Sequence, residues 1–158
     1  MTGRVVRVVP DQIYALRHRV LRADLPPESA HFEHDHDAVT AHFAVLGNEG
    51  SVIGCVTIHP APLDAEPAWR LRGMAVDPAA QTGGIGRRLL TAIDEHVRTA
   101  DGLPKLLWCH ARLPAVGFYE RCGWTAVTGV YDIPTAGPHR TMVRRLEASP
   151  RMPTVTPV

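Results

Sequence analysis

The chain has 158 residues, a length that fits one domain and leaves no room for a second catalytic domain. Its 17 lysines and arginines balance 16 aspartates and glutamates, so no broad positive field exists to hold nucleic acid or an anionic membrane. The cysteine count, 3, is odd in a chain large enough to form its own core, which favours a reducing compartment. No apolar run has the length of a signal peptide or a membrane span, so the sequence predicts a cytoplasmic protein.

The first elements expected are a strand and a helix. Paired valines in residues 2–9 predict the strand, which Pro10 ends. Over residues 12–22, apolar side chains recur at helical spacing and predict an amphipathic helix. Its apolar stripe consists of Ile13, Leu16, Val20 and Leu21. The arginines of this segment are expected on its other faces.

Residues 23–38 lose this periodicity. They carry two prolines and then a polar run, so we expect a loop with room for a short helix. Residues 40–46 and 51–58 are rich in strand-forming residues, and the segment between them contains two glycines. This pattern predicts an antiparallel hairpin.

A strand, a glycine loop and a helix are expected in direct succession. Residues 69–76 predict the strand, and residues 81–86 form the loop. The helix is predicted over residues 87–100, with Asp101-Gly102 ending it. Its buried face is expected to carry Ile85, Leu89, Ile93, His96 and Val97.

The last third predicts three strands and a short helix. The helix is expected over residues 113–122, and the strands are expected over 106–111, 125–131 and 140–146. The complete order is β-α-β-β-β-α-β-α-β-β. Residues 147–158 contain several prolines and few apolar groups, so they predict a disordered tail after a single domain of residues 1–146.

The glycine loop is a candidate anion site. Consecutive glycines let the backbone approach a ligand closely, and the first N–H groups of a helix point outward unpaired. Arg87 and Arg88 in the first turn favour a phosphate there. A P-loop would instead require lysine and a hydroxyl residue at these two positions, and a dinucleotide fingerprint would require glycine or alanine at Leu89. Taken alone, such a loop can also be purely structural.

Two segments resemble the GNAT N-acetyltransferase superfamily. Residues 71–78 read Leu-Arg-Gly-Met-Ala-Val-Asp-Pro, and Gln81-x-x-Gly84-x-Gly86 follows them, which together resemble the acetyl-CoA signature of that family. Residues 117–124, Gly-Phe-Tyr-Glu-Arg-Cys-Gly-Trp, resemble its downstream aromatic segment. The order of the predicted elements is also similar, so the resemblance extends over residues 2–146.

The resemblance implies the GNAT fold, an α/β (α+β) arrangement with a mixed, mostly antiparallel sheet of about six to seven strands and flanking helices. Strands 69–76 and 106–111 would run parallel and separate at their ends. Acetyl-CoA, the acyl donor, would lie in this gap and be held mainly by main-chain groups, with no metal. The residues implied to bind it are Met74, Ala75, Val76, Gln81, Thr82, Gly83, Gly84, Ile85, Gly86 and Arg87.

The implied activity is transfer of acetyl to a primary amine of an unidentified acceptor, by direct attack in a ternary complex. This reaction needs a neutral amine, a bound oxyanion and a proton for the departing thiolate. The resemblance places Tyr119 beside the CoA sulfur as the acid and a backbone N–H near Val76 at the oxyanion. A phenol with a pKa of about 10 suits a thiol leaving group. The alternative is that Tyr119 only packs.

The base is less directly indicated. Many relatives carry a glutamate on the strand before the glycine loop, where this chain has Arg70 and Arg72. His59, His110 and His139 lie near predicted strand ends and titrate in the useful range. We take His139, just before the final predicted strand, as the candidate, with the other two histidines and an ordered water left open.

The polar loop contains alternating histidines and carboxylates. The spacing of its histidines fits no common zinc pattern, which favours a solvated loop over a metal site. The resemblance implies that this region shapes the acceptor pocket, where its carboxylates would attract a cationic amine or simply keep the loop soluble. These carboxylates are Glu28, Glu33, Asp35 and Asp37.

A second function from a different class is a non-catalytic sensor or interaction protein that binds acyl-CoA with the same fold. The missing strand glutamate favours it, and Tyr119 argues against it. The expected partner is a small-molecule or peptide amine, with neither nucleic acid nor a membrane. Similar proteins are often dimers, so a homodimer is compatible with the sequence.

Overall fold

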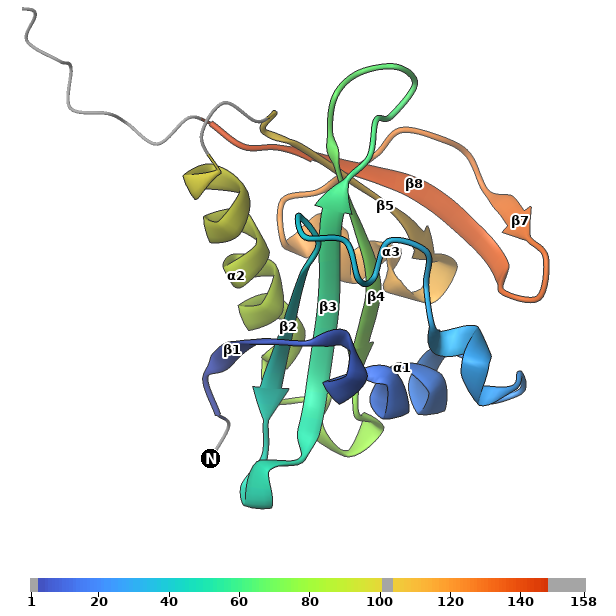
Figure 1. Ribbon diagram of the computed structural model, residues 1–158. Helices are drawn as coiled ribbons and strands as arrows, with labels where there is room; N and C mark the ends of the chain where they lie inside the picture. Colours follow the sequence, from blue (N-terminus) through green and yellow to red (C-terminus); the bar gives the residue numbers. More distant parts are fainter. Residues whose placement is uncertain (1–2, 101–103, 148–158) are drawn as a thin grey trace, which may run out of the picture.

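The computed structural model describes residues 3–100 and 104–147, and this part of the chain forms one sheet with helices on both faces (Figure 1). The strands are β1 (Val5–Val8), β2 (Ala41–Leu46), β3 (Val52–Pro60), β4 (Trp69–Val76), β5 (Leu106–Arg112), β6 (Thr125–Ala126), β7 (Tyr131–Ile133) and β8 (Gly137–Arg145). The α-helices are α1 (Tyr14–Leu21), α2 (Ile85–Thr99) and α3 (Val116–Arg121). Short 3₁₀ helices cover Pro10–Gln12, Pro27–Ala30, Asn48–Gly50, Pro78–Ala80 and Leu113–Ala115.

The sheet has the order β1-β2-β3-β4-β5-β8-β6, with β7 paired to β8. Within the described residues only β4 and β5 run parallel, so the predicted mixed, mostly antiparallel sheet is confirmed. The predicted hairpin of β2 and β3 is also antiparallel, as expected. These elements follow the predicted order along the chain.

One predicted strand is wrong in its extent. Residues 125–131 form two strands, β6 and β7, so the sheet has 8 strands rather than six or seven. Ala126 pairs with Met142, and Tyr131 pairs with His139. The segment from β6 to β7 therefore advances five residues while β8 advances three. The surplus residues bow out of the ladder around Thr128, whose hydroxyl accepts a hydrogen bond from the Thr141 N–H.

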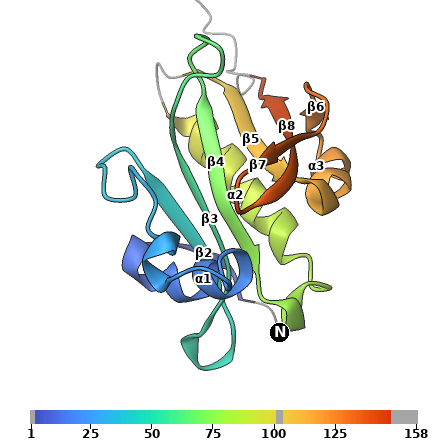
Figure 2. The ribbon, with the colours of Figure 1, turned by 90° about the vertical axis from the view of Figure 1, so that its right-hand side faces the viewer.

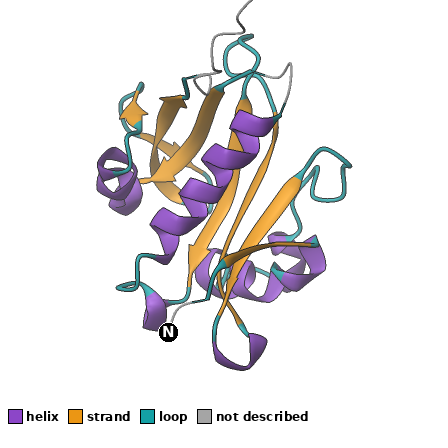
Figure 3. Ribbon diagram, turned by 90° about the vertical axis from the view of Figure 1, so that its left-hand side faces the viewer, coloured by secondary structure: helices purple, strands orange, loops and turns teal. Residues whose placement is uncertain are grey.

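The two faces of the sheet carry separate cores. The larger cluster lies between the sheet and α2 and α3, and Figure 3 shows α2 lying across this face. The buried residues of α2 are Ile85, Leu89, Leu90, Ile93 and Val97, close to the predicted set. On the opposite face Ile13 and Leu16 pack under α1 against Ala44, Cys55 and Ala75. Figure 2 shows α1 on one side of the sheet and α2 and α3 on the other.

A bulge in β4 changes which side chains face each core. Between the register pairs on either side, the single residue Val56 of β3 lies opposite both Gly73 and Met74 of β4. Gly73 has φ +65°, a conformation that glycine adopts without Cβ strain. Before the bulge Leu71 belongs to the α2 cluster, and after it Ala75 belongs to the α1 cluster. The strand therefore bends and reverses its pattern at the point where it leaves β5.

No helix in the described ranges is long and apolar enough to cross a membrane. Of the predictions near the chain ends, the helix end at Asp101-Gly102 and the tail from residue 148 onward lie outside the described residues, as do residues 1–2. The domain limits 1–146 therefore stay a prediction.

Candidate active site

The parallel strands β4 and β5 separate after a short stretch of pairing. They pair only at Trp69 with Leu107 and at Arg70 with Trp108, which confirms the predicted separation. From Leu71 onward, β4 has no strand partner on its β5 side within the described residues. Backbone N–H and C=O groups on that edge can therefore bond a ligand as an added strand would. A cavity of about 320 Å³ opens between the separated strands.

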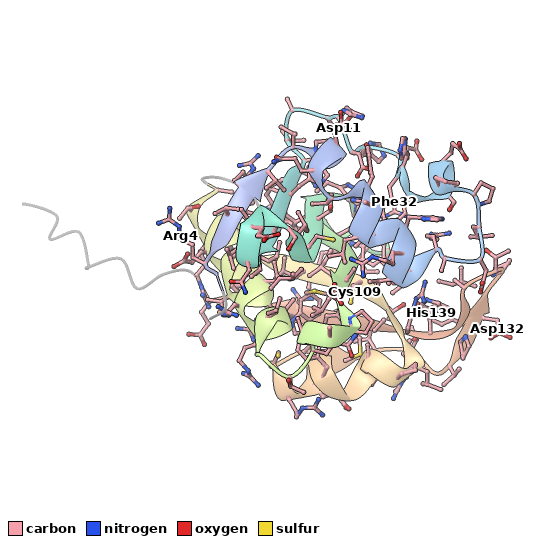
Figure 4. All side chains as sticks on the ribbon, turned by 90° about the horizontal axis from the view of Figure 1, so that it is seen from below. Arg4, Asp11, Phe32, Cys109, Asp132 and His139 are labelled. Carbon is pink, nitrogen blue, oxygen red and sulfur yellow. The ribbon has the colours of Figure 1, made fainter. Side chains whose placement is uncertain are left out.

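The cavity reaches both faces of the sheet and has two unlike sides. Toward α2 and α3 its wall is apolar apart from one phenol, with Leu71, Met74, Cys109, Phe118 and Tyr119. Toward α1 its wall is aromatic and basic, with Arg22, Phe32, Arg70, Arg72, His110 and His139. Figure 4 shows Phe32, Cys109 and His139 arriving from three separate segments. Because successive strand residues face opposite ways, neighbours such as Leu71 and Arg72 contribute to different sides.

Tyr119 lies on the apolar side, in α3. Its side chain is buried, and its ring makes edge contacts with Phe118 and Trp124 at 5.3 Å between centroids. Burial, followed by the adjacent Cys109 thiol, raises the pKa of Tyr119 well above its ordinary value. The phenol therefore stays protonated at neutral pH, and the raised pKa makes it a weaker acid than an ordinary phenol. Tyr119 therefore packs in the core and also lines the cavity, and its role as the acid stays a prediction.

The glycine loop begins α2 on the same side. Gly84 precedes the helix with φ 71°, and its carbonyl accepts the first helical hydrogen bond from Arg88 N–H at 3.2 Å. The Gly83 N–H donates to the Ala80 carbonyl at 3.2 Å, whereas the first N–H groups of the helix itself have no carbonyl one turn earlier to bond. A Cβ on Gly84 would meet nothing within 4 Å, whereas one on Gly86 would lie 2.9 Å from the Phe118 ring. Phe118 lines the cavity, so the loop and the cavity share a wall.

The other predicted donor-binding residues lie along this edge. Thr82 and Gly83 are exposed in the loop, and Gln81 donates from its side chain to the Val76 carbonyl at 3.2 Å. Met74 and Val76 pack against the α2 cluster, and Ala75 packs on the opposite face.

The two arginines at the start of α2 differ in their availability. Arg88 donates to the Gly3 carbonyl at 2.8 Å and to the Gly83 carbonyl at 3.5 Å, so backbone groups engage it. Arg87 is exposed. Of the two arginines expected to assist an anion, Arg87 is therefore the one that an anion can reach from solvent.

His139 is placed differently from the prediction. It lies inside β8, which starts at Gly137, and not before the strand. It is buried, lines the cavity, and sits opposite Arg112 of β5. Its Nδ1 lies 2.7 Å from the Gly137 carbonyl, which can only accept, so Nδ1 carries the proton. In the neutral ring, Nε2 is then the nitrogen with a lone pair to take a proton.

The other two histidine candidates fit less well. His110 lines the cavity, and its Nδ1 lies 2.5 Å from the Tyr131 hydroxyl. The ring is partly exposed, but partial loss of its solvation, followed by the charges of Arg70 and the neighbouring basic groups, lowers its pKa to about 4, which makes it a weak base. His59 does not line this cavity, and its ring stacks on His34.

The acidic loop, residues 23–38, contributes to the cavity wall but not through its carboxylates, so of the two roles expected for them the attraction of an amine inside the cavity is wrong. None of Glu28, Glu33, Asp35 and Asp37 lines it. Asp35 is buried and accepts from Arg17 at 2.7 Å, while Asp37 bonds His34 at the surface. Arg17 is itself fully buried, although the helical pattern placed it outside. From this loop, Phe32 lines the cavity. The centroid of the Phe32 ring lies 4.0 Å from the guanidinium carbon of Arg17.

The histidines of this loop are engaged separately. His34 bonds Asp37, His36 lies 3.2 Å from the Tyr14 hydroxyl, and His31 stacks on the Tyr14 ring. Over residues 3–100 and 104–147, no group of three or more histidine, cysteine or acidic side chains could hold a metal ion.

Sequence reasoning missed the basic side of the cavity. In the sequence, Arg70 and Arg72 point only to the glutamate that many relatives carry on this strand. Their alternation with the buried Trp69 and Leu71 was a usable signal, because it places both arginines on one face of a central strand. No local signal identified Phe32, because a long-range ion pair positions it.

Comparison with known proteins agrees with this geometry. The protein-family model described as "Acetyltransferase (GNAT) family" matches residues 11–124 of this chain. The uncharacterized N-acetyltransferase YitI of Bacillus subtilis (strain 168) is 32% identical over 142 residues, covering 88% of this chain and 93% of that protein. The chain therefore belongs to the GNAT acetyltransferase family.

Solved structures show the same fold at lower identity. Escherichia coli ElaA superposes with a TM-score of 0.72 at 19% identity, covering 92% of this chain and 100% of that one. An aminoglycoside 6'-N-acetyltransferase complexed with coenzyme A gives a TM-score of 0.70 at 15% identity, with coverages of 93% and 99%.

Proposed function

We propose that this protein transfers an acetyl group from acetyl-CoA to the primary amine of an acceptor, by direct attack in a ternary complex. The observation that carries the proposal is the position of Tyr119, a buried phenol on the wall of the cavity between β4 and β5. Membership of the GNAT family supports it, as does a structural relative that binds coenzyme A.

The donor is held mainly by backbone in this proposal. Its pantetheine arm bonds the open edge of β4 at Met74, Ala75 and Val76. Its pyrophosphate takes N–H groups from the loop and the positive end of α2. The loop residues assigned to it are Gln81, Thr82, Gly83, Gly84, Ile85, Gly86 and Arg87. The open space at Gly84 supports a close approach of the backbone to the phosphates.

The chemistry then follows from the two sides of the cavity. The amine nitrogen attacks the thioester carbon from the basic side, and a backbone N–H near Val76 stabilises the oxyanion. The C–S bond breaks, and Tyr119 supplies the proton that the thiolate takes up. The amine loses its proton to Nε2 of His139, the nitrogen left unprotonated by the bond to Gly137. The nearby arginines favour a neutral amine over an ammonium, because like charges repel.

The test is acceptor-dependent release of CoA thiol. The purified chain is incubated with acetyl-CoA and a panel of polyamines, amino acids, aminoglycosides and peptide N-termini, with a control that lacks acceptor. Thiol release that requires an amine supports the proposal. Tight binding of acetyl-CoA without release from any amine would identify the chain as a non-catalytic acyl-CoA sensor instead.

A further inference from the structure

The basic side of the cavity has a charge that the proposed reaction does not use. Four arginines line it, namely Arg22, Arg70, Arg72 and Arg112. No aspartate or glutamate of the described residues lines it. Asp35, the carboxylate that most opposes the charge on Arg72, is already bonded to Arg17. The cavity therefore carries several positive charges with no counter-charge in its wall.

Arg70 and Arg72 differ from Arg22 and Arg112 because each has a buried Nε atom without a hydrogen-bond partner among the described residues. Arg112 donates to the Leu21 carbonyl at 2.8 Å, and Arg17 behind them makes four hydrogen bonds. Arg70 and Arg72 have neither a hydrogen bond nor an ion pair with any described residue, and their Nε atoms are shielded from solvent. Buried donors normally have partners, so two adjacent exceptions indicate a missing acceptor.

Aromatic rings hold both guanidinium groups. The central carbon of Arg70 lies 5.2 Å from the Trp108 ring centroid, and that of Arg72 lies 4.2 Å from the Phe32 ring centroid. Such contacts orient the planar fork while leaving its N–H groups free. Side chains two residues apart on a strand project from the same face at a separation of roughly 7 Å. This arrangement suits two forks that converge on one oxyanion.

The crowding of charge is visible in Arg72. Burial, followed by the charges of Arg70 and Arg17, lowers the pKa of Arg72 to about 10. The group stays protonated at neutral pH, so the repulsion persists in the absence of an anion.

The phosphates of the donor do not explain this site. In the proposed function they lie at the glycine loop, which contacts the cavity from the α2 side through Phe118. Arg70 and Arg72 lie on the opposite face of the sheet, Arg70 over the Trp108 ring and Arg72 over the Phe32 ring. We therefore propose that the acceptor is a small amine that carries an anionic oxyacid group, a carboxylate or a phosphate, which Arg70 and Arg72 bind while its amine reaches the thioester. The amine part rests on the proposed function, and the anion site does not.

The first experiment compares amines of matched length. The values of kcat/KM are measured for 4-aminobutyrate, butylamine and 1,4-diaminobutane, and for 2-aminoethyl phosphate and ethanolamine. We expect an anionic member to exceed its neutral partner by about tenfold or more, as for charge-assisted bidentate bonds. Preference for the carboxylate or the phosphate series identifies the oxyacid. Equal or better use of the neutral or cationic members would overturn the proposal and leave the acetyltransferase assignment intact.

Variants separate charge from shape. In Arg70→Gln and Arg72→Gln, the preference for the anionic amine should fall by about tenfold. In Arg72→Glu, it should invert in favour of 1,4-diaminobutane, a gain that misfolding cannot produce. Arg145→Gln is the control, because Arg145 is exposed and pairs with Glu66 away from the cavity. An unchanged preference in all three cavity variants would contradict the assignment.

A binding experiment tests the anion site without requiring catalytic turnover. Calorimetry measures glutarate and inorganic phosphate binding to the CoA-loaded wild type, to Arg72→Gln and to Arg145→Gln. Binding of either anion that Arg72→Gln loses and Arg145→Gln keeps would support the anion site, even if no amine is acetylated and the proposed function fails. Absence of binding by both anions to the wild type would overturn the proposal.

Discussion

The guanidinium of Arg17 donates to the carboxylate of Asp35 at 2.7 Å, and both side chains are buried. Asp35 also accepts from the Phe32 N–H at 2.9 Å, so the pair ties the loop that carries Phe32 to α1. A second bond joins Arg17 to Thr57 of β3 at 2.8 Å. This buried pair therefore sets the position of one wall of the cavity.

Removal of Asp35 should strongly destabilise the fold. Asp35→Ala leaves the Arg17 charge buried without its partner, which typically costs about 3–5 kcal/mol. Urea denaturation at neutral pH measures this loss. Asp37→Ala is the matched control, because Asp37 belongs to an exposed pair with His34 and such pairs contribute about 0–1 kcal/mol. Equal stability of the two variants would contradict a structural role for the buried pair.

Tyr119→Phe should lower kcat while the affinity for acetyl-CoA stays the same. The variant keeps the ring that packs against Trp124 and removes only the proton donor. A positioned acid typically contributes about 10²–10⁴-fold to rate. Thiol-release assays measure kcat, and calorimetry measures the affinity for acetyl-CoA. Tyr14→Phe is the control, because Tyr14 does not line the cavity. A Tyr119→Phe enzyme with wild-type kcat would remove this role.

Gly86→Val should weaken acetyl-CoA binding. The new Cβ would lie 2.9 Å from the Phe118 ring, so Phe118 must move and the wall shared by the loop and the cavity changes. Gly129→Val is the matched control, because a Cβ there meets nothing within 4 Å. Calorimetric titration with acetyl-CoA compares the two variants. Identical dissociation constants would show that the loop does not shape the donor site.

Stability should fall as the pH drops from about 6.5 toward 4. The folded protein lowers the pKa of His110 to about 4, mainly because surrounding atoms displace part of the water around its ring. The unfolded chain then binds protons that the folded chain does not, and acid favours unfolding over this interval. Burial lowers the pKa of His42, His59 and His96 in the same direction. His110→Gln should flatten the dependence of the urea midpoint on pH, and a slope parallel to wild type would argue against this cause.

Arg72→Met should leave the fold as stable as wild type or raise its stability by about 0.5–2 kcal/mol. The substitution removes a partly buried charge that lies near Arg70 and Arg17 and lacks a partner among the described residues. Residues that serve binding commonly lower the stability of the ligand-free protein, so their replacement commonly raises it. Urea denaturation of the ligand-free protein measures the change. A clear loss of stability would indicate that Arg72 has a structural role.

Local pattern by itself determined the elements of this protein. The glycine loop before α2, the strand β4 and the aromatic segment of α3 are short-range features, and each formed where the sequence predicted it. Periodicity is sufficient here because neighbours along the chain share one helix face or one strand face. The balanced charge of the whole chain excluded a broad positive field, yet it concealed the basic wall of the cavity.

Tertiary structure alone decided which residues of β4 beyond Gly73 face each core and where the carboxylates of the acidic loop lie. The bulge at Gly73 reverses the faces of β4, and the Arg17–Asp35 pair draws one carboxylate of the acidic loop inward and away from the acceptor side. Both depend on contacts between residues far apart in sequence, which local periodicity does not encode. The side of the cavity expected to attract a cation is therefore the side that presents Arg70 and Arg72.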